Sequence, residues 1–430
     1  MSRMGNSRFW GKITVLIAVC GWGLSAQAKY SGGSGTEAEP FRIGAVPDWQ
    51  ELMATPADWA SHFILTSDID LDGVSITPIA PDTSTSYRFQ GTPFTGVFDG
   101  NDYVIRNVDV NMPGSDYVGL FGYLGMDGQI KNLSAEDISI VGRWSVGGLV
   151  GHSSVGTITN CYSTGSVSGN RYVGGLVGHS SVGTITNCYS TGSVSGYGYV
   201  GGLAGHNEEA TISNCYSAGS VNGVLDVGGL AGYNEEATIS NCYSAGSVNG
   251  VLDVGGLVGN NIDDGVVTNC YSSASVAGED YVGGLVAFNS VGTITNCYST
   301  GAVTGEDAVG GLAGYTGGTI TNCYSSGLVT GDLRLGGLVG WHDGAIGNSF
   351  WDVNTSGWTT SSGGTPKTTA EMKTQTTFTS AGWDFIEVWD IGENQTYPFL
   401  RTYLGGDINH DGVVDFRDIA HLAESWLRGV

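Results

Sequence analysis

The stretch TITNCYSTGSVSGYGYVGGLAGHNEEA, residues 184–210, is one copy of a unit that recurs through much of the chain. Each copy contains the phrase Asn-Cys-Tyr-Ser, and successive cysteines are separated by 27, 27, 27, 28, 27 and 26 residues. A period of this size, with the same apolar positions each time, indicates one structural unit stacked on copies of itself. The cysteines that mark the units are Cys161, Cys188, Cys215, Cys242, Cys270, Cys297 and Cys323.

Apolar residues form columns when the copies are aligned on their cysteines. In the copy around Cys188 they are Ile185, Val194 and the Leu203 of Val-Gly-Gly-Leu. β-Branched residues in short stretches, separated by Gly, Ser and Asn, indicate strands and turns, and the many glycines disfavour helix. The chain is therefore predicted to be all-β, a parallel β-solenoid of about 27-residue coils with two or three short strands per coil. Nine coils starting at Val118 would rise roughly 43 Å, at about 4.8 Å per coil.

Two polar or sulfur-bearing columns accompany the apolar ones. One cysteine per coil at the same place predicts a stack of mostly free, buried thiols, because parallel Cβ vectors are a poor start for a disulfide. The asparagine before each cysteine tolerates a left-handed backbone at a bend and can hydrogen-bond its counterpart in the next coil. These asparagines are Asn160, Asn187, Asn214, Asn241, Asn269, Asn296, Asn322 and Asn348.

Val-Gly-Gly-Leu-Val-Gly at residues 146–151 and its copies resemble the GLUG motif, named for Gly-Leu-x-Gly. The resemblance spans roughly residues 41–403 and implies an exported bacterial surface protein built on a β-solenoid. It implies less about activity. Flanking stretches fit the leading coils and the closing segment of such an array, and they are residues 63–71, 96–101, 119–122, 348–352 and 381–385.

The first residues have the features of a secretory signal peptide. Basic residues precede an apolar run from Ile13 to Leu24, which ends at Ala26-Gln27-Ala28. We expect cleavage after Ala28 and a secreted location, extracellular or at the cell surface. The apolar run is shorter than the roughly 20 residues that cross a bilayer, so no membrane span is expected.

The chain is strongly acidic, with a formal net charge of −25. Loss of Arg3, Arg8 and Lys12 with a signal peptide would make it three units more negative. Arg171 and Arg334 are the only Lys or Arg residues between positions 146 and 351. Phosphate contacts by Lys and Arg supply most nucleic-acid affinity, so a nucleic-acid partner is excluded. An acidic surface instead keeps a protein soluble and attracts divalent cations.

A calcium-binding loop is predicted near the C-terminus. Oxygen-bearing side chains fall at loop positions 1, 3, 5, 9 and 12, a glycine stands at position 6, and position 7 offers its carbonyl. Calcium takes about six to eight oxygens in flexible geometry, which this spacing supplies. The alternative is an acidic turn without an ion. The predicted ligands are Asp407, Asn409, Asp411, Val413, Asp415 and Asp418.

This loop, with Asp at position 12 and an apolar helical stripe after it, resembles one repeat of a type I dockerin. Dockerins carry two such repeats and dock onto cohesin modules, whereas this chain has one. The resemblance implies a small EF-hand-like loop and helix that binds a cohesin-like module or a cell-surface component. A calcium-stiffened terminus is the other interpretation.

Open solenoid ends expose unpaired strand edges, so a cap is expected at each end. Residues 49–60 carry Leu52, Met53 and Trp59 on a predicted short helix. The predicted segments of the chain are a signal peptide (1–28), a linker (29–40), an N-terminal cap with leading coils (41–117), the GLUG-repeat solenoid (118–351), a C-terminal capping segment (352–403) and the dockerin-like repeat (404–430).

A column rich in rings stands six residues after the valine of each Val-Gly-Gly-Leu phrase. Rings on one face can stack against sugars or a partner surface, and the three histidines can ligate a metal. Aromatic packing at a corner of the coil is the third interpretation. The column is Tyr123, His152, His179, His206, Tyr233, Asn260, Phe288, Tyr315 and Trp341, and all but Tyr123 and Asn260 are candidate ligand-binding residues.

No catalytic residue is assigned from the sequence. It contains no His-Glu-x-x-His zinc motif and no Gly-x-Ser-x-Gly elbow. Glu209, Glu236 and Asp263 share a column that we interpret as solvated turns, with a shared calcium as the alternative. The leading hypothesis is a secreted, non-enzymatic surface or matrix protein for adhesion or for binding carbohydrate or a partner. The alternative is a carbohydrate-active β-helix enzyme, a polysaccharide hydrolase or lyase, carried to an assembly by the dockerin-like repeat.

Overall fold

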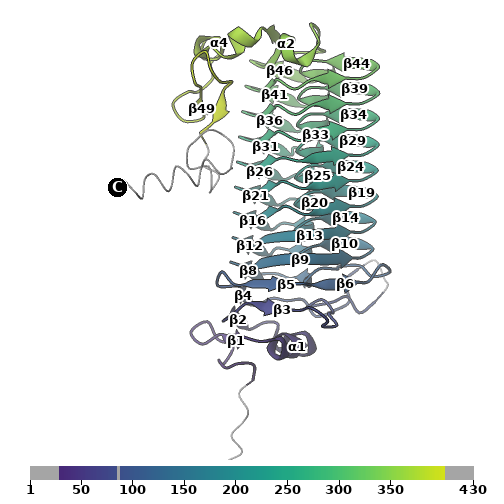
Figure 1. Cartoon of the computed structure of the whole chain (residues 1–430), viewed down its shortest axis with the longest axis vertical. Helices are drawn as coiled ribbons and strands as arrows, with labels where there is room; N and C mark the ends of the chain where they lie inside the picture. Colours follow the sequence, from purple (N-terminus) through teal and green to yellow (C-terminus); the bar gives the residue numbers. More distant parts are fainter. Residues whose placement is uncertain (1–28, 85–87, 402–430) are drawn as a thin grey trace, which may run out of the picture.

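A computed structural model describes residues 29–84 and 88–401 of the chain. Within these ranges the chain winds into an elongated β-solenoid of stacked coils (Figure 1). The fold class predicted from the repeat is confirmed. The predicted signal peptide and the dockerin-like repeat, with its calcium ligands, lie outside the described residues.

Each regular coil contains five short strands. In one coil they are β21 (Thr211–Ser213), β22 (Tyr216–Ser217), β23 (Ser220–Asn222), β24 (Leu225–Gly228) and β25 (Ala231–Glu235). The prediction of two or three strands per coil was wrong. A coil of this length must turn through a full circle, and every bend interrupts pairing, so the strands are more numerous and shorter.

Equivalent strands of successive coils pair in parallel and in register, which builds long faces along the rod. The first face comprises β1 (Phe41–Ile43), β2 (His62–Leu65), β4 (Val97–Asp99), β8 (Gln129–Lys131), β12 (Thr157–Thr159), β16 (Thr184–Thr186), β21, β26 (Thr238–Ser240), β31 (Val266–Thr268), β36 (Thr293–Thr295), β41 (Thr319–Thr321) and β46 (Ala345–Gly347).

The second face begins with short strands, continues with the two long strands β9 (Ser134–Val141) and β13 (Tyr162–Ser168), and then divides into two rows of short strands. It comprises β3 (Ile69–Asp70), β5 (Val104–Arg106), β6 (Asp109–Asn111), β9 (Ser134–Val141), β13 (Tyr162–Ser168), β17 (Tyr189–Ser190), β18 (Ser193–Ser195), β22, β23, β27 (Tyr243–Ser244), β28 (Ser247–Asn249), β32 (Tyr271–Ser272), β33 (Ser275–Ala277), β37 (Tyr298–Ser299), β38 (Val303–Thr304), β42 (Tyr324–Ser325), β43 (Val329–Thr330), β47 (Phe350–Asp352) and β48 (Thr365–Lys367).

The third and fourth faces are formed by consecutive strands of the same coil. The third face starts one coil later along the rod than the fourth. The third comprises β10 (Trp144–Gly147), β14 (Arg171–Gly174), β19 (Gly198–Gly201), β24, β29 (Leu252–Gly255), β34 (Asp280–Gly283), β39 (Asp307–Gly310) and β44 (Leu333–Gly336). The fourth comprises β7 (Phe121–Leu124), β11 (Val150–Ser154), β15 (Val177–Ser181), β20 (Ala204–Glu208), β25, β30 (Val258–Ile262), β35 (Val286–Asn289), β40 (Ala313–Thr316) and β45 (Val339–His342).

The predicted apolar columns fill the interior of the rod. Ile185, Val194 and Leu203 are buried, as are their counterparts in the neighbouring coils. The glycines of the repeat permit this close packing. A Cβ on Gly175 would lie 2.2 Å from both the carbonyl oxygen of Gly202 and the Ser190 hydroxyl. The glycine is required because the next coil and the opposite wall both contact its backbone.

The cysteine column is buried and its thiols are free, as predicted. The sulfurs of Cys188, Cys215, Cys242 and Cys270 also accept hydrogen bonds, as when the Cys188 N–H donates to the Cys215 sulfur at 3.3 Å. Burial raises the pKa of the Cys188 and Cys215 thiols well above the usual value. At the end of the column Ser349 takes over, and its hydroxyl accepts from the Cys323 N–H at 3.1 Å.

The asparagine column is also confirmed. Asn187 has a left-handed backbone, with φ of 55°, and its amide donates to the Asn160 amide oxygen at 3.1 Å. A second ladder lies inside the rod and was not predicted. There Asn207, Asn234 and Asn261 are linked by amide hydrogen bonds of 2.8 Å, and the ladder continues through Asn289 to Thr316.

At the N-terminal end, α1 (Val46–Ala54) and the 3₁₀ turn η1 (Pro56–Asp58) cover the first coil (Figure 1). Asp48 accepts hydrogen bonds from the Gly44 and Ala45 N–H groups, and the helix ends before Pro56. Trp49 is buried edge-on against Phe98 at 5.8 Å between ring centroids. The predicted N-terminal helix is present, although it starts and ends earlier than expected.

At the other end the chain folds back over the last coils. α2 (Val353–Ser356), α3 (Thr369–Met372), α4 (Gln375–Thr379) and the antiparallel pair β49 (Trp389–Asp390) and β50 (Phe399–Leu400) form this part. The buried Asp352 carboxylate accepts from the Thr369 and Tyr397 hydroxyls at 2.7 and 2.6 Å. Trp383 and Trp389 belong to one buried cluster with Tyr298 and Tyr324 of the second face.

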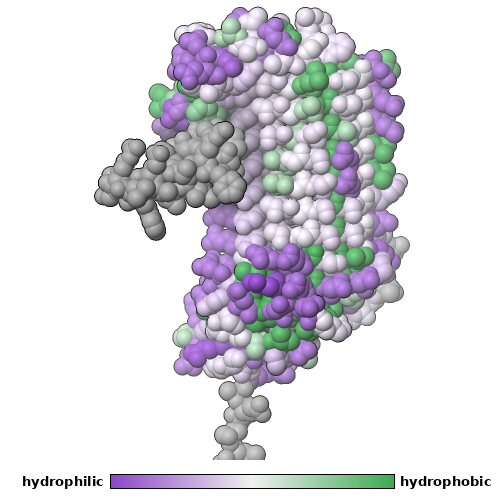
Figure 2. Space-filling view, in the orientation of Figure 1, coloured by the Kyte–Doolittle hydropathy of each residue, from purple (hydrophilic) through white to green (hydrophobic). Residues whose placement is uncertain are grey.

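Among the described residues, no helix is both long enough and apolar enough to cross a membrane. The face turned to the viewer in Figure 2 is mostly of intermediate hydropathy, with narrow hydrophobic lines along the rod. Hydrophilic residues gather near its N-terminal end and on the C-terminal segment (Figure 2). The part of the rod visible in this view is thus a repetitive surface.

Candidate functional site: a stripe of rings along the rod

The predicted ring column lies on the fourth face, where in-register pairing stacks its members. β11 and β15 align His152 with His179, β15 and β20 align His179 with His206, and the next pair aligns His206 with Tyr233. Because side chains alternate along a strand, the rings point outward while the residue after each ring points inward. In the four coils from Asn207 to Asn289 those inward residues form the buried asparagine ladder.

The rings are in contact over most of the column. His152 stacks on Tyr123 at 4.7 Å between ring centroids, and His179 stacks on His206 at the same distance and 17° between planes. Phe288 and Tyr315 stack at 4.6 Å. Such ring pairs add about 0.5–1.5 kcal/mol beyond the area they bury. These contacts confirm that the rings of the column pack against one another, as the corner-packing interpretation predicts.

A second set of rings, which sequence reasoning missed, lies beside the column on the third face. Tyr172 and Tyr199 stack at 5.1 Å and 4°, and Tyr172 also contacts His179. Their backbones are left-handed, with φ of 57° and 54°. The available signal was the tyrosine before the valine in several Val-Gly-Gly-Leu phrases. Both sets together are here called the ring stripe, and it comprises Tyr117, Tyr123, His152, Tyr172, His179, Tyr199, His206, Tyr233, Tyr281, Phe288, Tyr315 and Trp341.

The ring stripe is partly open to solvent. Most of its rings are half-buried, and Trp341 at its far end is 39% exposed. Two cations lie over it, since the Arg171 guanidinium is 4.7 Å from the Tyr199 ring centroid and that of Arg334 is 5.0 Å from Trp341. Exposed faces of half-buried rings offer flat apolar contact without the cost of ordering a flexible side chain.

Three polar residues interrupt the ring stripe near its middle. The Asn260 amide nitrogen donates to both Asp226 and Asp253, the latter at 3.2 Å. Burial, together with the neighbouring Asp226 charge, raises the pKa of Asp253 to about 7. Burial also raises the pKa of Asp226. Asp226 and Asp253 occupy the same position of their coils as Tyr199 and Tyr281 do in the coils on either side, so the repeat period places the carboxylate pair between rings.

Two of the three candidate histidines meet carboxylates of the following coil. His179 Nε2 lies 2.9 Å from Glu208 Oε2, and His206 Nε2 lies 3.1 Å from Glu235 Oε2. The potential ligand atoms of His179, His206 and Glu208 all lie within 4.8 Å of one another. His152 makes no such contact with a carboxylate among the described residues. His152 therefore differs from the other two in lacking a carboxylate partner, although its ring lies 4.6 Å from that of His179.

The electrostatics of these groups follow from burial and from their contacts. Burial and the nearby His179 lower the pKa of His206 to about 3, and burial lowers that of His152 well below its usual value. The hydrogen bond from His179 lowers the pKa of Glu208, whereas burial and nearby acidic groups raise that of Glu235. His152 and His206 are neutral at pH 7, so each imidazole keeps a lone pair.

Glu209, Glu236 and Asp263 lie at exposed turns with left-handed backbone, which agrees with their interpretation as solvated turn residues. Glu236 and Asp263 line an open hollow of about 540 Å³ together with Asp264 and Val291. Val182 occupies the equivalent turn two coils before Glu236, so the position does not require an acid.

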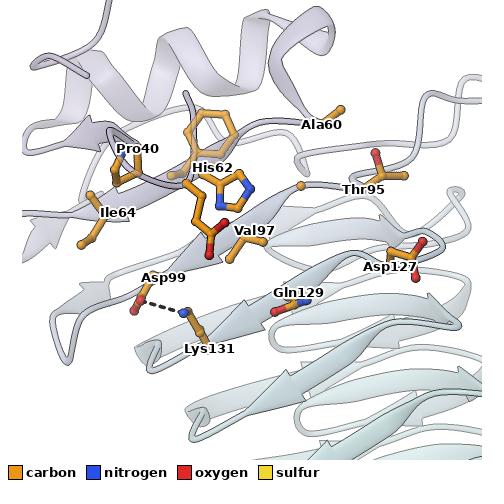
Figure 3. A pocket seen from close by; sticks show the side chains of 13 residues that line it. Pro40, Ala60, His62, Ile64, Thr95, Val97, Asp99, Asp127, Gln129 and Lys131 are labelled. Atoms are coloured by element: carbon orange, nitrogen blue, oxygen red, sulfur yellow. Dashed lines mark ion pairs between the residues drawn. The ribbon is translucent and has the colours of Figure 1, made fainter. Parts of the chain in front are cut away.

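A second hollow, of about 510 Å³, lies at the N-terminal end between the segment before β1 and strands β2, β4 and β8 (Figure 3). Figure 3 shows the ion pair of Lys131 with Asp99, whose nearest atoms are 3.2 Å apart. Burial acts to raise the pKa of Asp99, but hydrogen bonds from Asn132 and Asn101 and the Lys131 charge lower it overall. His62 and Gln129 also line this hollow.

Comparison with known proteins identifies the repeat. The GLUG motif matches seven consecutive stretches, residues 142–168, 169–195, 196–222, 223–249, 250–277, 278–304 and 305–330. A stretch of 157 residues, 34% of the chain, is 34% identical to halomucin of Haloquadratum walsbyi. A stretch of 71 residues, 15% of the chain, is 44% identical to a protein of Evansella cellulosilytica named as a Gly-rich membrane protein. These matches span only 2% and 8% of the two relatives.

Two solved structures are similar to this chain in the overall path of the backbone. One, described as an immunoglobulin A1 protease from Bacteroides ovatus, is 22% identical with a TM-score of 0.42, over 86% of this chain and 95% of that one. The other, an IgA1 protease, is 22% identical with a TM-score of 0.43, over 59% of this chain and 21% of that one. Neither likeness bears on activity.

Proposed function

Given that this chain is a GLUG-motif repeat protein whose repeats form a β-solenoid, we propose that it is a secreted, non-enzymatic surface or matrix protein that binds carbohydrate through the ring stripe. The observation that carries the proposal is the two runs of mostly half-buried rings, from Tyr117 to Tyr233 and from Tyr281 to Trp341, along one edge of a rigid rod. A polysaccharide presents repeated sugar faces, and repeated aromatic rings at one coil spacing offer it repeated stacking contacts. Adhesion then results from many weak contacts along the rod.

Several observations support an extended ligand over a small molecule. The rings lie on the outside of strands, and both hollows described above lie elsewhere and are lined mainly by polar or charged residues. Small-molecule sites are usually concave and mostly apolar. The acidic chain with few cations also fits a neutral sugar polymer better than an anionic one.

The test is a binding screen of the purified full chain on neutral and acidic polysaccharides, by affinity electrophoresis and sedimentation with insoluble glycans. Trp341→Ala and Tyr315→Ala should each weaken binding about tenfold, which corresponds to roughly 1.4 kcal/mol for one lost ring contact. Ile386→Ala is the matched control, because Ile386 is exposed and apolar but lies in the C-terminal segment. The proposal is wrong if no polysaccharide binds, or if the ring variants bind as the wild type does.

We also propose that residues 404–430 bind calcium and attach the rod to a cohesin-like module or a cell-surface component. The support is the ligand spacing of Asp407, Asn409, Asp411, Asp415 and Asp418. Calorimetry should show a calcium-binding event that Asp411→Ala removes. Pull-down on cohesin modules should then depend on calcium, and capture that survives a chelator would count against the dockerin resemblance.

A carbohydrate-active enzyme is the second candidate, and the pair Asp226 and Asp253 favours it. Glycosidases use two carboxyl groups, one of which keeps its proton near neutral pH, and the raised pKa of Asp253 suits that acid. Incubation with polysaccharides, followed by assay for reducing ends and unsaturated products, discriminates the candidates. Products that Asp253→Asn abolishes would establish the enzyme, whereas binding without turnover would leave the adhesion proposal standing.

A further inference from the structure

We propose that His179, His206 and Glu208 form a binding site for a divalent transition-metal ion, with zinc as the reference ion. The three side chains come from neighbouring strands β15 and β20 on the outside of the fourth face. The potential ligand atoms lie within 4.8 Å of one another. Two imidazoles and a carboxylate are a donor set typical of zinc, and they leave a coordination position open for water or for a donor group of a partner.

The contacts already present indicate how an ion would fit. His179 Nε2 and Glu208 Oε2 face each other at 2.9 Å, so a cation can take the place of the shared proton between them. The His206 ring lies over that of His179 at 4.7 Å. Two nitrogens on one tetrahedral zinc lie about 3.4 Å apart, given Zn–N bonds near 2.05 Å, so binding would draw the two rings together.

The carboxylates around His179, His206 and Glu208 favour a bound cation at this cluster. Glu235 lies 3.1 Å from His206 and is available as a further oxygen donor. Repulsion from Glu208, Asp263 and Glu236 contributes to the raised pKa of Glu235, and a divalent ion would relieve that repulsion. The Glu208 side chain is 37% exposed, which gives an ion access from solvent.

The His206 ring supplies an independent observation. It is nine-tenths buried, and its Nδ1 atom has no hydrogen-bond partner. Unpaired polar atoms are rare in protein interiors and require an explanation.

The chain itself provides a conservative test variant. The coils at 201–227 and 228–254 are identical except that His206 in the first is Tyr233 in the second. The substitution His206→Tyr therefore reproduces a ring that the same environment already accommodates. It removes one ligand, keeps the stacked ring and leaves the fold intact. His152→Tyr is the matched control, because it replaces a stacked histidine outside the cluster with the residue found at position 123.

The experiment is calorimetric titration of zinc into the full chain at pH 7.5, in excess calcium so that sites built only from oxygen ligands are filled. Zinc should bind, and the affinity should fall at least tenfold in His206→Tyr and Glu208→Gln. His152→Tyr should bind as the wild type does. Imidazole NMR signals of His179 and His206 should shift most with the first equivalent of zinc, and those of His152, whose ring lies 4.6 Å from that of His179, should shift less.

Three outcomes would overturn the inference. The first is an absence of zinc binding at micromolar concentration. The second is equal affinity in the wild type and His206→Tyr. The third is binding in which the signals of His179 and His206 do not move, which would place the ion elsewhere. The inference stands apart from carbohydrate binding, since Trp341→Ala should leave zinc affinity unchanged.

Discussion

At the residue scale, backbone conformation explains much of the repeat. Each of the four coils between Val155 and Asp253 has three non-glycine residues with positive φ, and one of these positions takes Val155, Val182, Glu209 and Glu236 in turn. Asparagine and aspartate tolerate this conformation, whereas a β-branched residue there is strained at a cost of about 1–3 kcal/mol. The two valines are therefore weak points at exposed turns.

Replacement of Val182 by asparagine should stabilise the protein. Val182 has φ of 55° and is 50% exposed, so the change relieves strain without loss of core packing. We expect a gain of about 1 kcal/mol in the free energy of unfolding, measured by thermal or denaturant unfolding. Val251→Asn is the control, since Val251 is also exposed but is absent from the positive-φ residues. An equal effect at both valines would exclude relief of strain as the cause.

The buried histidines should make the protein sensitive to mild acid. His206 has its pKa lowered to about 3 in the folded chain, whereas in the unfolded chain it titrates near 6.5. The unfolded state therefore binds more protons as the pH falls below 6.5, and stability declines by up to about 1.4 kcal/mol per pH unit for this group.

Stability measured at pH 7 and pH 5 checks this expectation. Between these values the wild type should lose about 2 kcal/mol more than His206→Tyr, because the tyrosine does not titrate in that range. A parallel decline in the two proteins would show that His206 is protonated as readily in the folded chain as in the unfolded one.

At the element scale, each strand is too short to be stable alone, and the ladders between coils hold the stack together. The buried ladder of Asn207, Asn234 and Asn261 is the clearest case. Each amide donates both to the next amide and to a backbone carbonyl, as Asn234 does to Ala237 at 3.0 Å. This hydrogen-bonded chain of buried amides, in which only the Asn207 oxygen at the start has no partner, orders the turn between the fourth and first faces.

Truncation of one member should be costly. Asn234→Ala removes the acceptor of Asn207 and the donor to Ala237, and it leaves a cavity in the interior. We expect a loss of about 3 kcal/mol in the free energy of unfolding. Asn249→Ala, at an exposed position with one hydrogen bond of 3.2 Å to Asn222, should cost less than about 0.5 kcal/mol. Similar losses in both variants would contradict a special role for the buried ladder.

At the scale of the whole molecule, the caps keep a stack of identical coils from continuing into another molecule. The Ser361 hydroxyl accepts from the Val339 N–H at 2.9 Å, and Thr360 accepts from the Gly337 N–H at 3.1 Å. These contacts satisfy the edge of the last coil, which would otherwise pair with any exposed strand.

Removal of the C-terminal segment should therefore cause association. A variant that ends at Asp352 exposes the edges of the last coil and the rings of Tyr298 and Tyr324, and we expect it to form end-to-end oligomers. Sedimentation velocity measures the change in size. A variant that ends at Arg401 retains the described cap and is the control. A monomeric Asp352 variant would show that the last coil is protected in another way.

The sequence by itself determined the period, the parallel stacking, the interior columns and the free thiols. It could do so because each coil of such a repeat contacts only its two neighbours, so equivalent residues make the same contacts in every coil. Alternation along the strands also implied that the ring column and the residue after it face opposite ways.

Only the tertiary structure decided which polar residues meet across coils. His179 and Glu208 come from different coils and stand at different positions within them. The distance between such side chains depends on the angle through which the chain bends at the corner of each coil. That bend is set by left-handed residues whose conformation, apart from the asparagines, no sequence pattern marks.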